Sequence, residues 1–339
     1  MTENQTQLTS SEIASIWTCY LNATMSNCIL EYFLTHVEDE ETKSIVELTY
    51  KLTTSHSEQL AKFFEREQIP VPIGFTKEDV NLNAPRLYTD TFMLTFINHM
   101  SKMWLLSFSG FISLSAREDI RSFFIEGLKH VAELFDKSTN VELSQGVFVR
   151  APYIAYPTKT DYVDSKKYLN GSFFFSKQRP LNTIEISHLF MNIQTNLIGC
   201  KLALSFAQIS PRENLQKLML RGNEISKKHI QVFTATLLDN NIQPPISSDV
   251  CITDATTPPF SDKLTLFLMG ALSAAGVGNY ATAAAASQRS DLVLNYERLS
   301  LEIALFAKDG AFIMIENNWL EQPPGTIDKK ELAKTKDTE

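Results

Sequence analysis

The second half of this 339-residue sequence repeats its first half. When the chain is shifted over itself by 173 positions, identical residues coincide without a gap, among them Glu12 with Glu185, His56 with His229 and Pro85 with Pro258. After one deletion the offset becomes 172, and it then pairs Arg117 with Arg289 and Asp119 with Asp291. Residues that do the same structural job in both copies predict two tandem domains of one fold. Two domains also suit a chain of this length better than one core does.

Capping signals mark the helix starts in both copies. The first helix is expected to begin after Thr9 in copy one and after Asn182 in copy two, because a glutamate follows each at the third helical position. Helix two of copy two is expected to start at Ser210, which a proline follows. Ser115 and Ser287 are predicted to cap helix four of the two copies. These signals predict an all-α fold with four helices in each copy.

Connection lengths predict how the helices are joined. In each copy, helices two and three are separated by a long proline-bearing segment, residues 69–86 and 242–260, whereas the other connections are short. This order is typical of a bundle with one crossover. The sequence therefore predicts two tandem ferritin-like four-helix bundles, each with a long crossover between helices two and three.

The two bundles have predicted boundaries and a predicted linker. Copy one is expected at residues 8–152 and copy two at residues 181–324, followed by a charged tail at 325–339. The joining segment, 153–180, contains three consecutive phenylalanines at 173–175. A flexible linker would not carry such a run, so we predict an ordered aromatic linker that packs across the junction of the bundles. The alternative is an exposed patch that binds a partner.

Composition limits the classes of partner and the cellular location that we expect. The chain has 31 basic and 39 acidic residues, a net charge of −8, and its basic residues are scattered, which argues against nucleic acid as a partner. The N-terminus lacks the basic and apolar stretches of a signal peptide, so we expect a cytoplasmic protein. Residues 264–287 are uncharged and long enough to span a bilayer, but polar residues interrupt them, and we predict a core helix and no membrane contact. The four cysteines lack Cys-x-x-Cys spacing and are predicted core or loop thiols.

Histidines and carboxylates of copy one form the candidate metal site. A carboxylate-bridged di-iron centre needs Glu-x-x-His pairs on two helices, and neither copy has such a pair. Copy one offers a looser set of residues, Glu31, His56, His99, Glu126 and His130. Imidazole and carboxylate groups suit Zn²⁺ or a similar ion. Only His56 has a histidine counterpart, His229, and a recurring lone histidine is more typical of a hydrogen-bonded core residue than of a ligand.

The sequence therefore predicts no catalytic residues and no cofactor. It contains no glycine-rich phosphate loop, no Gly-x-Ser-x-Gly elbow and no His-Glu-x-x-His motif. A divalent metal held by Glu31, His56, Glu126 and His130 is kept as the alternative.

Five segments of copy two carry a resemblance to a known family. They are residues 179–189, 227–230, 258–264, 276–280 and 309–311. These segments are similar to an uncharacterised family of Bacillus-type spore formers in which a ferritin-like domain is duplicated, and whose members are described as spore coat proteins related to the coat protein F group. The resemblance implies a duplicated ferritin-like fold and association with the spore. It implies no catalytic mechanism.

Two functional hypotheses follow. The first is a non-enzymatic structural or interaction protein of the spore coat or sporulating cell, which binds coat proteins or further copies of itself. Coat proteins are made in the mother-cell cytoplasm and then deposited on the spore, which agrees with the missing signal peptide. The second hypothesis is a divergent ferritin-like protein that binds a metal or a small ligand.

Overall fold

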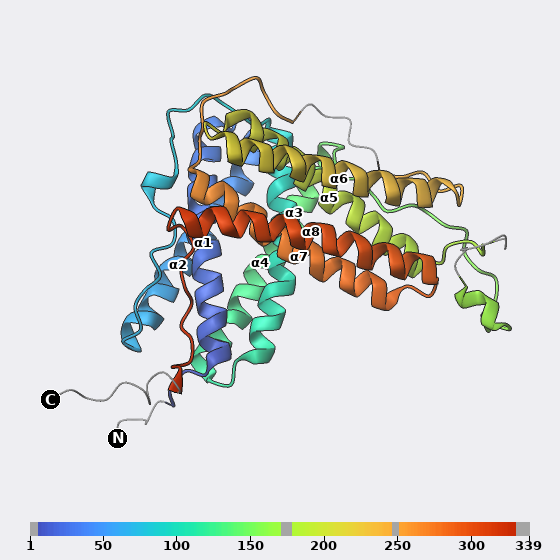
Figure 1. Ribbon diagram of the computed structural model, residues 1–339, viewed down its shortest axis with the longest axis horizontal. Coiled ribbons are helices and arrows are strands. Elements are labelled where there is room, and N and C mark those ends of the chain that lie inside the picture. The colour runs from blue at the N-terminus through green and yellow to red at the C-terminus, as the bar shows by residue number, and fades with distance from the viewer. Residues whose placement is uncertain (1–5, 171–177, 246–250, 330–339) are drawn as a thin grey trace.

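The computed structural model of the protein describes residues 6–170, 178–245 and 251–329, which contain eight α-helices in two groups of four (Figure 1). The first group consists of α1 (Ser10–His36), α2 (Glu40–Arg66), α3 (Asp90–Leu114) and α4 (Glu118–Ser144). The second group consists of α5 (Thr183–Ile209), α6 (Glu213–Leu238), α7 (Asp262–Ala286) and α8 (Ser290–Glu316). The two groups lie crosswise in Figure 1. The prediction of an all-α fold with two four-helix groups is confirmed.

The predicted order of short, long and short connections is also confirmed. In both groups the first and third connections have three residues, at 37–39, 115–117, 210–212 and 287–289. The second connections, or crossovers, run through residues 67–89 and 239–261. The first crossover contains a short 3₁₀ helix, η1 (Lys77–Asp79). Because α3 and α7 have the same length and begin 172 positions apart, the one-residue deletion lies before α7.

The helix starts agree with the sequence in part. Thr9 and Asn182 cap α1 and α5, and each forms a reciprocal capping box with the glutamate at the third helical position. The predicted starts at Ser115, Ser287 and Ser210 are wrong, because these serines are the C-caps of α3, α7 and α5. The hydroxyls of Ser115 and Ser287 donate to carbonyl oxygens one turn earlier, which closes the preceding helix. The following helices begin three residues later.

The two crossovers lie side by side and pair with each other. Antiparallel bridges join Val80 to Phe260 and Tyr88 to Ile252. The backbone N–H of Thr253 donates to the carbonyl oxygen of Leu87 at 2.9 Å, and further backbone bonds flank this one. Each long connection therefore supplies hydrogen-bond partners for the other, which is how buried backbone groups away from helices are satisfied.

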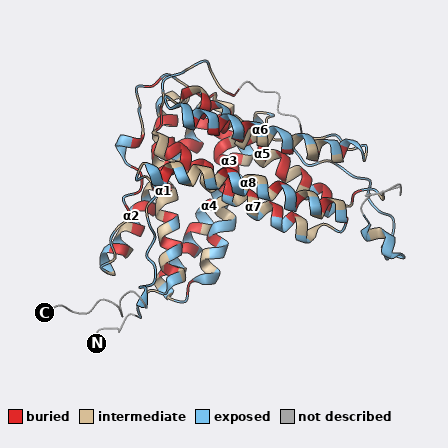
Figure 2. Cartoon of the chain, viewed as in Figure 1, coloured by how far each residue is buried: buried red, intermediate tan, exposed pale blue. Residues whose placement is uncertain are grey.

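A central apolar cluster contains residues from both groups of helices. Tyr32 and Phe33 of α1 lie in it together with Phe206 of α5 and Leu264 of α7. Two smaller clusters fill the far end of each group, and buried residues run along the inner faces of the helices (Figure 2). The two groups are therefore not separate domains with separate cores, because the largest apolar cluster contains residues of both.

The linker and the tail are described only in part. Tyr153, Tyr156 and Tyr162 are exposed, so this stretch of the linker covers no core surface. The second 3₁₀ helix, η2 (Lys166–Leu169), holds Tyr168 beneath the Arg179 guanidinium, 3.9 Å from the ring centre. The three phenylalanines at 173–175 and most of the charged tail lie outside the described residues, so the predicted packing of the aromatic run stays a prediction.

Helix α7 is long and apolar enough to cross a membrane by length and composition, and it is the one such helix in the described part of the chain. Half of its most apolar window is buried inside the protein. Core helices of soluble proteins meet the same criterion. The expectation of no membrane contact remains a prediction.

Candidate functional site

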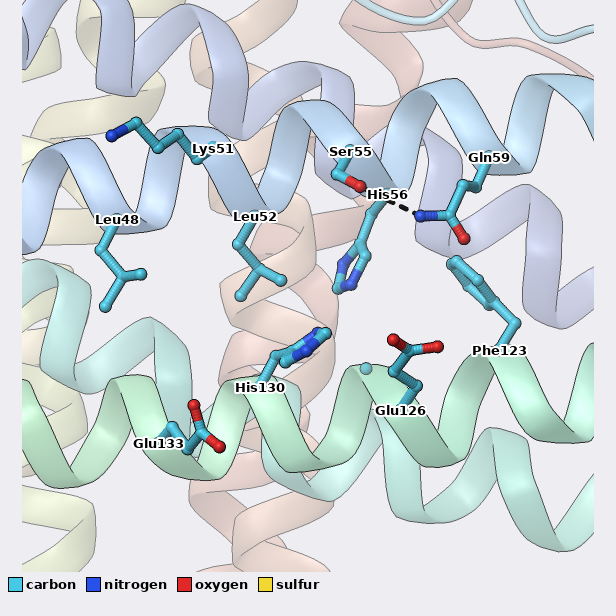
Figure 3. Close-up of a pocket in the computed structure, with 11 residues that line it drawn as sticks. Leu48, Lys51, Leu52, Ser55, His56, Gln59, Phe123, Glu126, His130 and Glu133 are labelled. Atoms are coloured by element: carbon cyan, nitrogen blue, oxygen red, sulfur yellow. Dashed lines mark hydrogen bonds between the residues drawn. The ribbon is translucent and has the colours of Figure 1, made fainter.

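Three of the four residues of the predicted metal site line one pocket. His56 on α2 faces Glu126 and His130 on α4 across a pocket of about 310 Å³ (Figure 3). Glu31 belongs to α1 and does not line this pocket. His99, on α3, lines a different pocket at the junction of the two groups. The sequence therefore predicted correctly that His56, Glu126 and His130 lie together. Glu31 and His99 lie elsewhere.

The His56 ring sits among aromatic side chains. Its centre lies 5.5 Å from the ring centre of Phe108 and 5.4 Å from that of Phe123. Burial lowers the pKa of His56 to about 4, and the nearby His130 adds to this effect. The imidazole is therefore neutral at pH 7 and has one nitrogen that can accept a hydrogen bond or bind a cation.

The matching site in the second group is closed by hydrogen bonds. His229 has no exposed surface, and its Nδ1 shares a hydrogen bond of 2.9 Å with the hydroxyl of Tyr280. Its Nε2 lies 3.4 Å from Glu302, which also pairs with Lys228. At the 172 offset, Tyr280 corresponds to Phe108, which has no hydroxyl. His229 thus fits the predicted hydrogen-bonded core histidine.

The pocket of Figure 3 is not arranged as a metal centre. Within the described ranges, no group of three or more His, Cys, Asp or Glu side chains could hold one ion. His56, Glu126 and His130 face the same space, but they do not converge on one point. Metal binding by these residues stays a prediction that needs a measurement.

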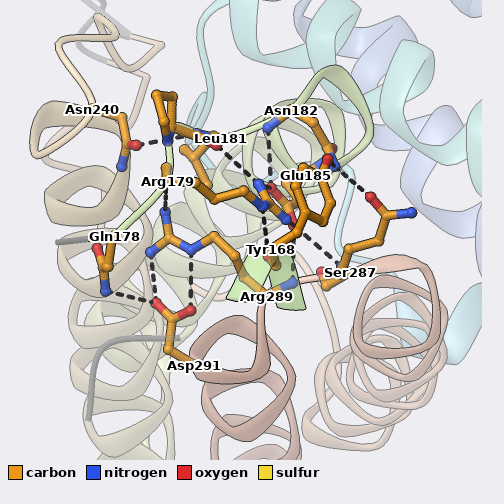
Figure 4. Close-up of polar contacts among 12 residues, drawn as sticks. Tyr168, Gln178, Arg179, Leu181, Asn182, Glu185, Asn240, Ser287, Arg289 and Asp291 are labelled. Carbon is orange, nitrogen blue, oxygen red and sulfur yellow. Dashed lines mark hydrogen bonds and ion pairs between the residues drawn. The ribbon is translucent and has the colours of Figure 1, made fainter. Parts of the chain in front are cut away.

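A buried polar cluster, absent from the sequence-based candidates, ties the starts of α5 and α8 together (Figure 4). Glu185 Oε1 accepts hydrogen bonds from the backbone N–H groups of Gln288 (3.1 Å) and Arg289 (3.0 Å). The Arg179 guanidinium donates to both oxygens of this carboxylate, at 2.7 and 2.9 Å. Arg289, 1% exposed, donates to both oxygens of Asp291. The carboxylate satisfies N–H groups that have no partner inside α8.

The first group contains a similar arrangement, with a threonine, Thr6, at the position of Arg179. Glu12 Oε1 accepts the backbone N–H of Arg117 at 2.7 Å, and the Arg117 guanidinium donates to both oxygens of Asp119 at 2.8 Å. Glu67 and Arg66 complete the cluster. The signal for these residues was the recurrence of Glu, Arg and Asp at fixed positions in both copies. Their contacts are those of a structural clamp between helix ends rather than of a reactive site.

The cysteines show no reactive arrangement. All four are free thiols, and Cys19, Cys28 and Cys251 are buried. Burial raises the pKa of Cys19 and of Cys28 to about 12, so both are protonated thiols at neutral pH.

Each match to a known protein or family is about as long as one copy of the duplication. A family model described as "Protein of unknown function (DUF3231)" matches residues 1–160 and again residues 170–332. The chain belongs to the DUF3231 family. Among solved structures, this DUF3231 protein is similar to one titled "putative spore coat protein" from Bacillus halodurans C-125, with 20% identity and a TM-score of 0.37. That match covers 46% of this chain and 98% of the other. No curated protein matches the chain.

Proposed function

We propose that this DUF3231 protein is a non-enzymatic structural protein of the spore coat, and that it associates with a second copy of itself through helix α8. It would be made in the mother-cell cytoplasm and then deposited on the spore. The spore association is supported by the sequence resemblance to coat proteins of Bacillus-type spore formers. The self-association is supported by the surface of α8.

The observation that carries this proposal is an apolar seam along the exposed side of α8. Its members follow at alternating spacings of four and three residues and are Leu294, Arg298, Leu301, Leu305, Lys308, Phe312 and Ile315. The apolar members are between 48% (Leu294) and 61% (Leu301) exposed. This spacing is that of a seam between two paired helices. Large apolar side chains gathered in one exposed stripe mark an interaction surface, whereas single ones do not.

Helix α4 provides an internal control, because it is the counterpart of α8 in copy one. At the 172 offset, the seam residues correspond to Ser122, Glu126, Lys129, Glu133, Asp136, Asn140 and Leu143. These positions are also exposed, but all except the last are polar. The fold therefore does not demand an apolar surface here. A stripe that is present in only one of two equivalent helices points to a role outside the folding of the chain.

The charges of α8 fit a second copy in antiparallel orientation. When Leu301 lies opposite Phe312 of the second copy, Leu305 lies opposite Lys308. Arg298 then lies beside Glu316 of the second copy, and Lys308 lies beside Glu302. Each cation within the seam meets a carboxylate, and the rest of the seam is apolar. Glu302 and Asp309 are already paired within their own chain, with Lys228 and Arg221, which limits repulsion between the two copies.

Size-exclusion chromatography with light scattering tests this pairing. We expect the full-length protein to run at twice its mass of 38.3 kDa. The variant Leu301→Glu with Leu305→Glu should run as a monomer with unchanged helicity, because carboxylates would face each other in the seam. The matched control is Lys129→Glu, which creates the same pair of glutamates on α4 and should leave the dimer intact. A monomeric wild-type protein would overturn the pairing.

Spore fractionation tests the location. In a sporulating Bacillus-type host, tagged wild-type protein is expected in the coat extract of purified spores, and the seam double variant is expected to be depleted from it. Wild-type protein found only in the mother-cell cytoplasm would contradict the coat assignment, even if the protein forms a dimer in solution.

The second candidate function, metal or small-ligand binding by copy one, is favoured by the open pocket at His56, Glu126 and His130. Elemental mass spectrometry of the purified protein, before and after chelation, tests it. One tightly held ion per chain, together with a melting temperature that falls after chelation and no longer does so in His56→Ala, would establish this function. Protein without bound metal, whose melting curve excess Zn²⁺ leaves unchanged, would exclude it for this ion.

A further inference from the structure

A second pocket lies where the two groups of helices meet. It has a volume of about 220 Å³ and is bounded by α3, α4 and α5, by the segment after α4 and by the second crossover. Its polar lining residues include Asn98, His99, Lys102, Glu142, Gln194 and Lys201. This volume is below the roughly 300–1,000 Å³ of pockets that hold drug-sized ligands. The pocket therefore suits a small metabolite rather than a nucleotide or a peptide.

Three polar side-chain groups in this pocket make no hydrogen bond and no close ion pair within the described part of the chain. His99 is 7% exposed, and its Nε2 has no hydrogen bond. Glu142 is 5% exposed, its carboxylate receives no hydrogen bond from a described residue, and its attraction to Lys102 acts at a distance beyond that of an ion pair. The Lys102 ammonium, half-buried on α3, has no described carboxylate within 4 Å either; it lies 5.8 Å from the ring centre of Phe135 and attracts Glu142 at longer range. Polar and charged groups that are buried without a hydrogen-bonded partner are costly, and a bound ligand that donates to or accepts from them would remove this cost.

The fold itself does not need these groups. At the 172 offset, His99, Lys102 and Glu142 correspond to Ala271, Ala274 and Met314. The second copy therefore keeps the same helices with small or apolar residues at all three positions. A costly set of charges that appears in one copy alone is better explained by a ligand than by folding.

We propose that this pocket binds a small zwitterion of the α-amino acid type, with its ammonium group on Glu142 and its carboxylate on Lys102 and His99. A simple anion such as phosphate would leave Glu142 unpaired, and a simple amine would leave Lys102 unpaired. A molecule that carries both groups pairs with Glu142 and with Lys102. Lys201, whose Nζ lies 2.8 Å from Cys251 Sγ, also lines the pocket and adds positive potential to it. This site is independent of the α8 seam.

Thermal shift followed by calorimetric titration of the full-length protein tests the proposal. The probes are the twenty standard α-amino acids, one at a time. At least one is expected to raise the melting temperature saturably, and its methyl ester and the matching acid without the amino group are expected to bind at least about tenfold more weakly. Glu142→Gln and Lys102→Met should each weaken binding by about tenfold or more, whereas Lys129→Met, on exposed α4 surface, should not.

Several outcomes would overturn the site. Binding that persists in both pocket variants would place the ligand elsewhere, and equal binding of the acid without the amino group would exclude the role of Glu142. Circular dichroism of both variants is measured alongside, and the two are expected to stay folded, because the other copy has uncharged residues at these positions. The absence of any shift with all twenty probes would reject an amino acid ligand.

Discussion

Glu12 and Glu185 each close the starts of two helices with one carboxylate. In the second group, Glu185 accepts the N–H of its own cap residue, Asn182, and two N–H groups at the start of α8. Burial alone would raise the pKa of Glu185, but the hydrogen bonds from Arg179 and from backbone N–H groups outweigh it and lower the pKa. The carboxylate is therefore ionised in the folded protein over the whole neutral range.

Glu185→Gln is expected to reduce the free energy of unfolding by about 2–4 kcal/mol at pH 7, because Arg179 loses its charged partner inside the protein. A lowered folded-state pKa contributes stability above the unfolded value of 4.5, and this contribution is lost as pH falls below it. The difference between wild type and variant should therefore shrink in acid. Urea denaturation at pH 7 and at a pH below 4.5 measures this difference. The control variant is Glu213→Gln, which changes an exposed glutamate on α6. A loss below about 0.5 kcal/mol would contradict the clamp.

The sequence predicted only half of this role. Thr9 with Glu12, and Asn182 with Glu185, are spaced as capping boxes, and both boxes are present. The contacts with Arg117 and Arg289 join residues more than a hundred positions apart. Local spacing rules cannot find such a contact, because it depends on how the first and fourth helices pack. The recurrence of the same residue types in both copies was the available hint.

Glu142 should give the stability of the protein an opposite pH dependence. Burial raises the pKa of Glu142 to about 7, and Lys102 counteracts part of the effect. The folded protein then keeps a proton between the unfolded value of 4.5 and about 7, so the free energy of unfolding falls as pH rises through this window. Glu142→Gln should be more stable than wild type by about 1–3 kcal/mol near pH 8 and similar to it near pH 4.5. Urea denaturation without ligand measures this, with exposed Glu133→Gln as control, and a pH-independent difference would refute it.

At the scale of elements, three helix starts differ from those that the sequence predicts. Ser115 and Ser287 looked like N-caps, but they end α3 and α7. A serine next to a three-residue connection can serve either helix, because its hydroxyl accepts from a following N–H or donates to a preceding carbonyl. The length of the connection decides between these roles, and this length cannot be read from the sequence before the helix ends are known.

Close packing of α3 against α4 depends on Gly127. A Cβ atom added there would lie 2.2 Å from Cε1 of Phe108, a ring that is 4% exposed. Gly127→Ala is therefore expected to cost about 1–3 kcal/mol in thermal or urea unfolding. Phe108→Leu in the same chain should recover part of the loss. Gly110→Ala, in exposed α3 with no atom within 4 Å, should instead stabilise by up to about 1 kcal/mol. Equal changes in the free energy of unfolding for Gly127→Ala and Gly110→Ala would contradict the close packing of α3 against α4 at Gly127.

At the scale of the whole molecule, the sequence predicted the number of helices, their grouping and the crossovers, because repeats and connection lengths are local features. It did not predict that the crossovers pair with each other or that the central core takes residues from both groups. Both depend on the angle between the groups, which no periodicity records. For the same reason the sequence suggested the pocket of His56 and His130, whose helices belong to one copy, and missed the junction pocket of His99, Lys102 and Glu142.

The shared core predicts that the two halves stay together when the chain between them is cut. A protease site inserted between Tyr156 and Tyr162, in exposed linker, can be cleaved in the folded protein. The nicked protein should keep the native mass and helicity and separate into two bands only after denaturation, because Phe33 and Phe206 lie in one apolar cluster.

The halves expressed alone make the matched comparison. Fragment 1–160 should expose the central cluster, bind a hydrophobic dye and regain native behaviour only when mixed with fragment 170–332. Linker cleavage that releases two stable bundles would mean that each half carries its own sufficient core. The duplication would then have joined two domains that each fold independently. Fragments that depend on each other mean instead that the two copies have become one folding unit, in which residues such as Lys102 and Glu142 could diverge at the junction while both sets of helices were retained.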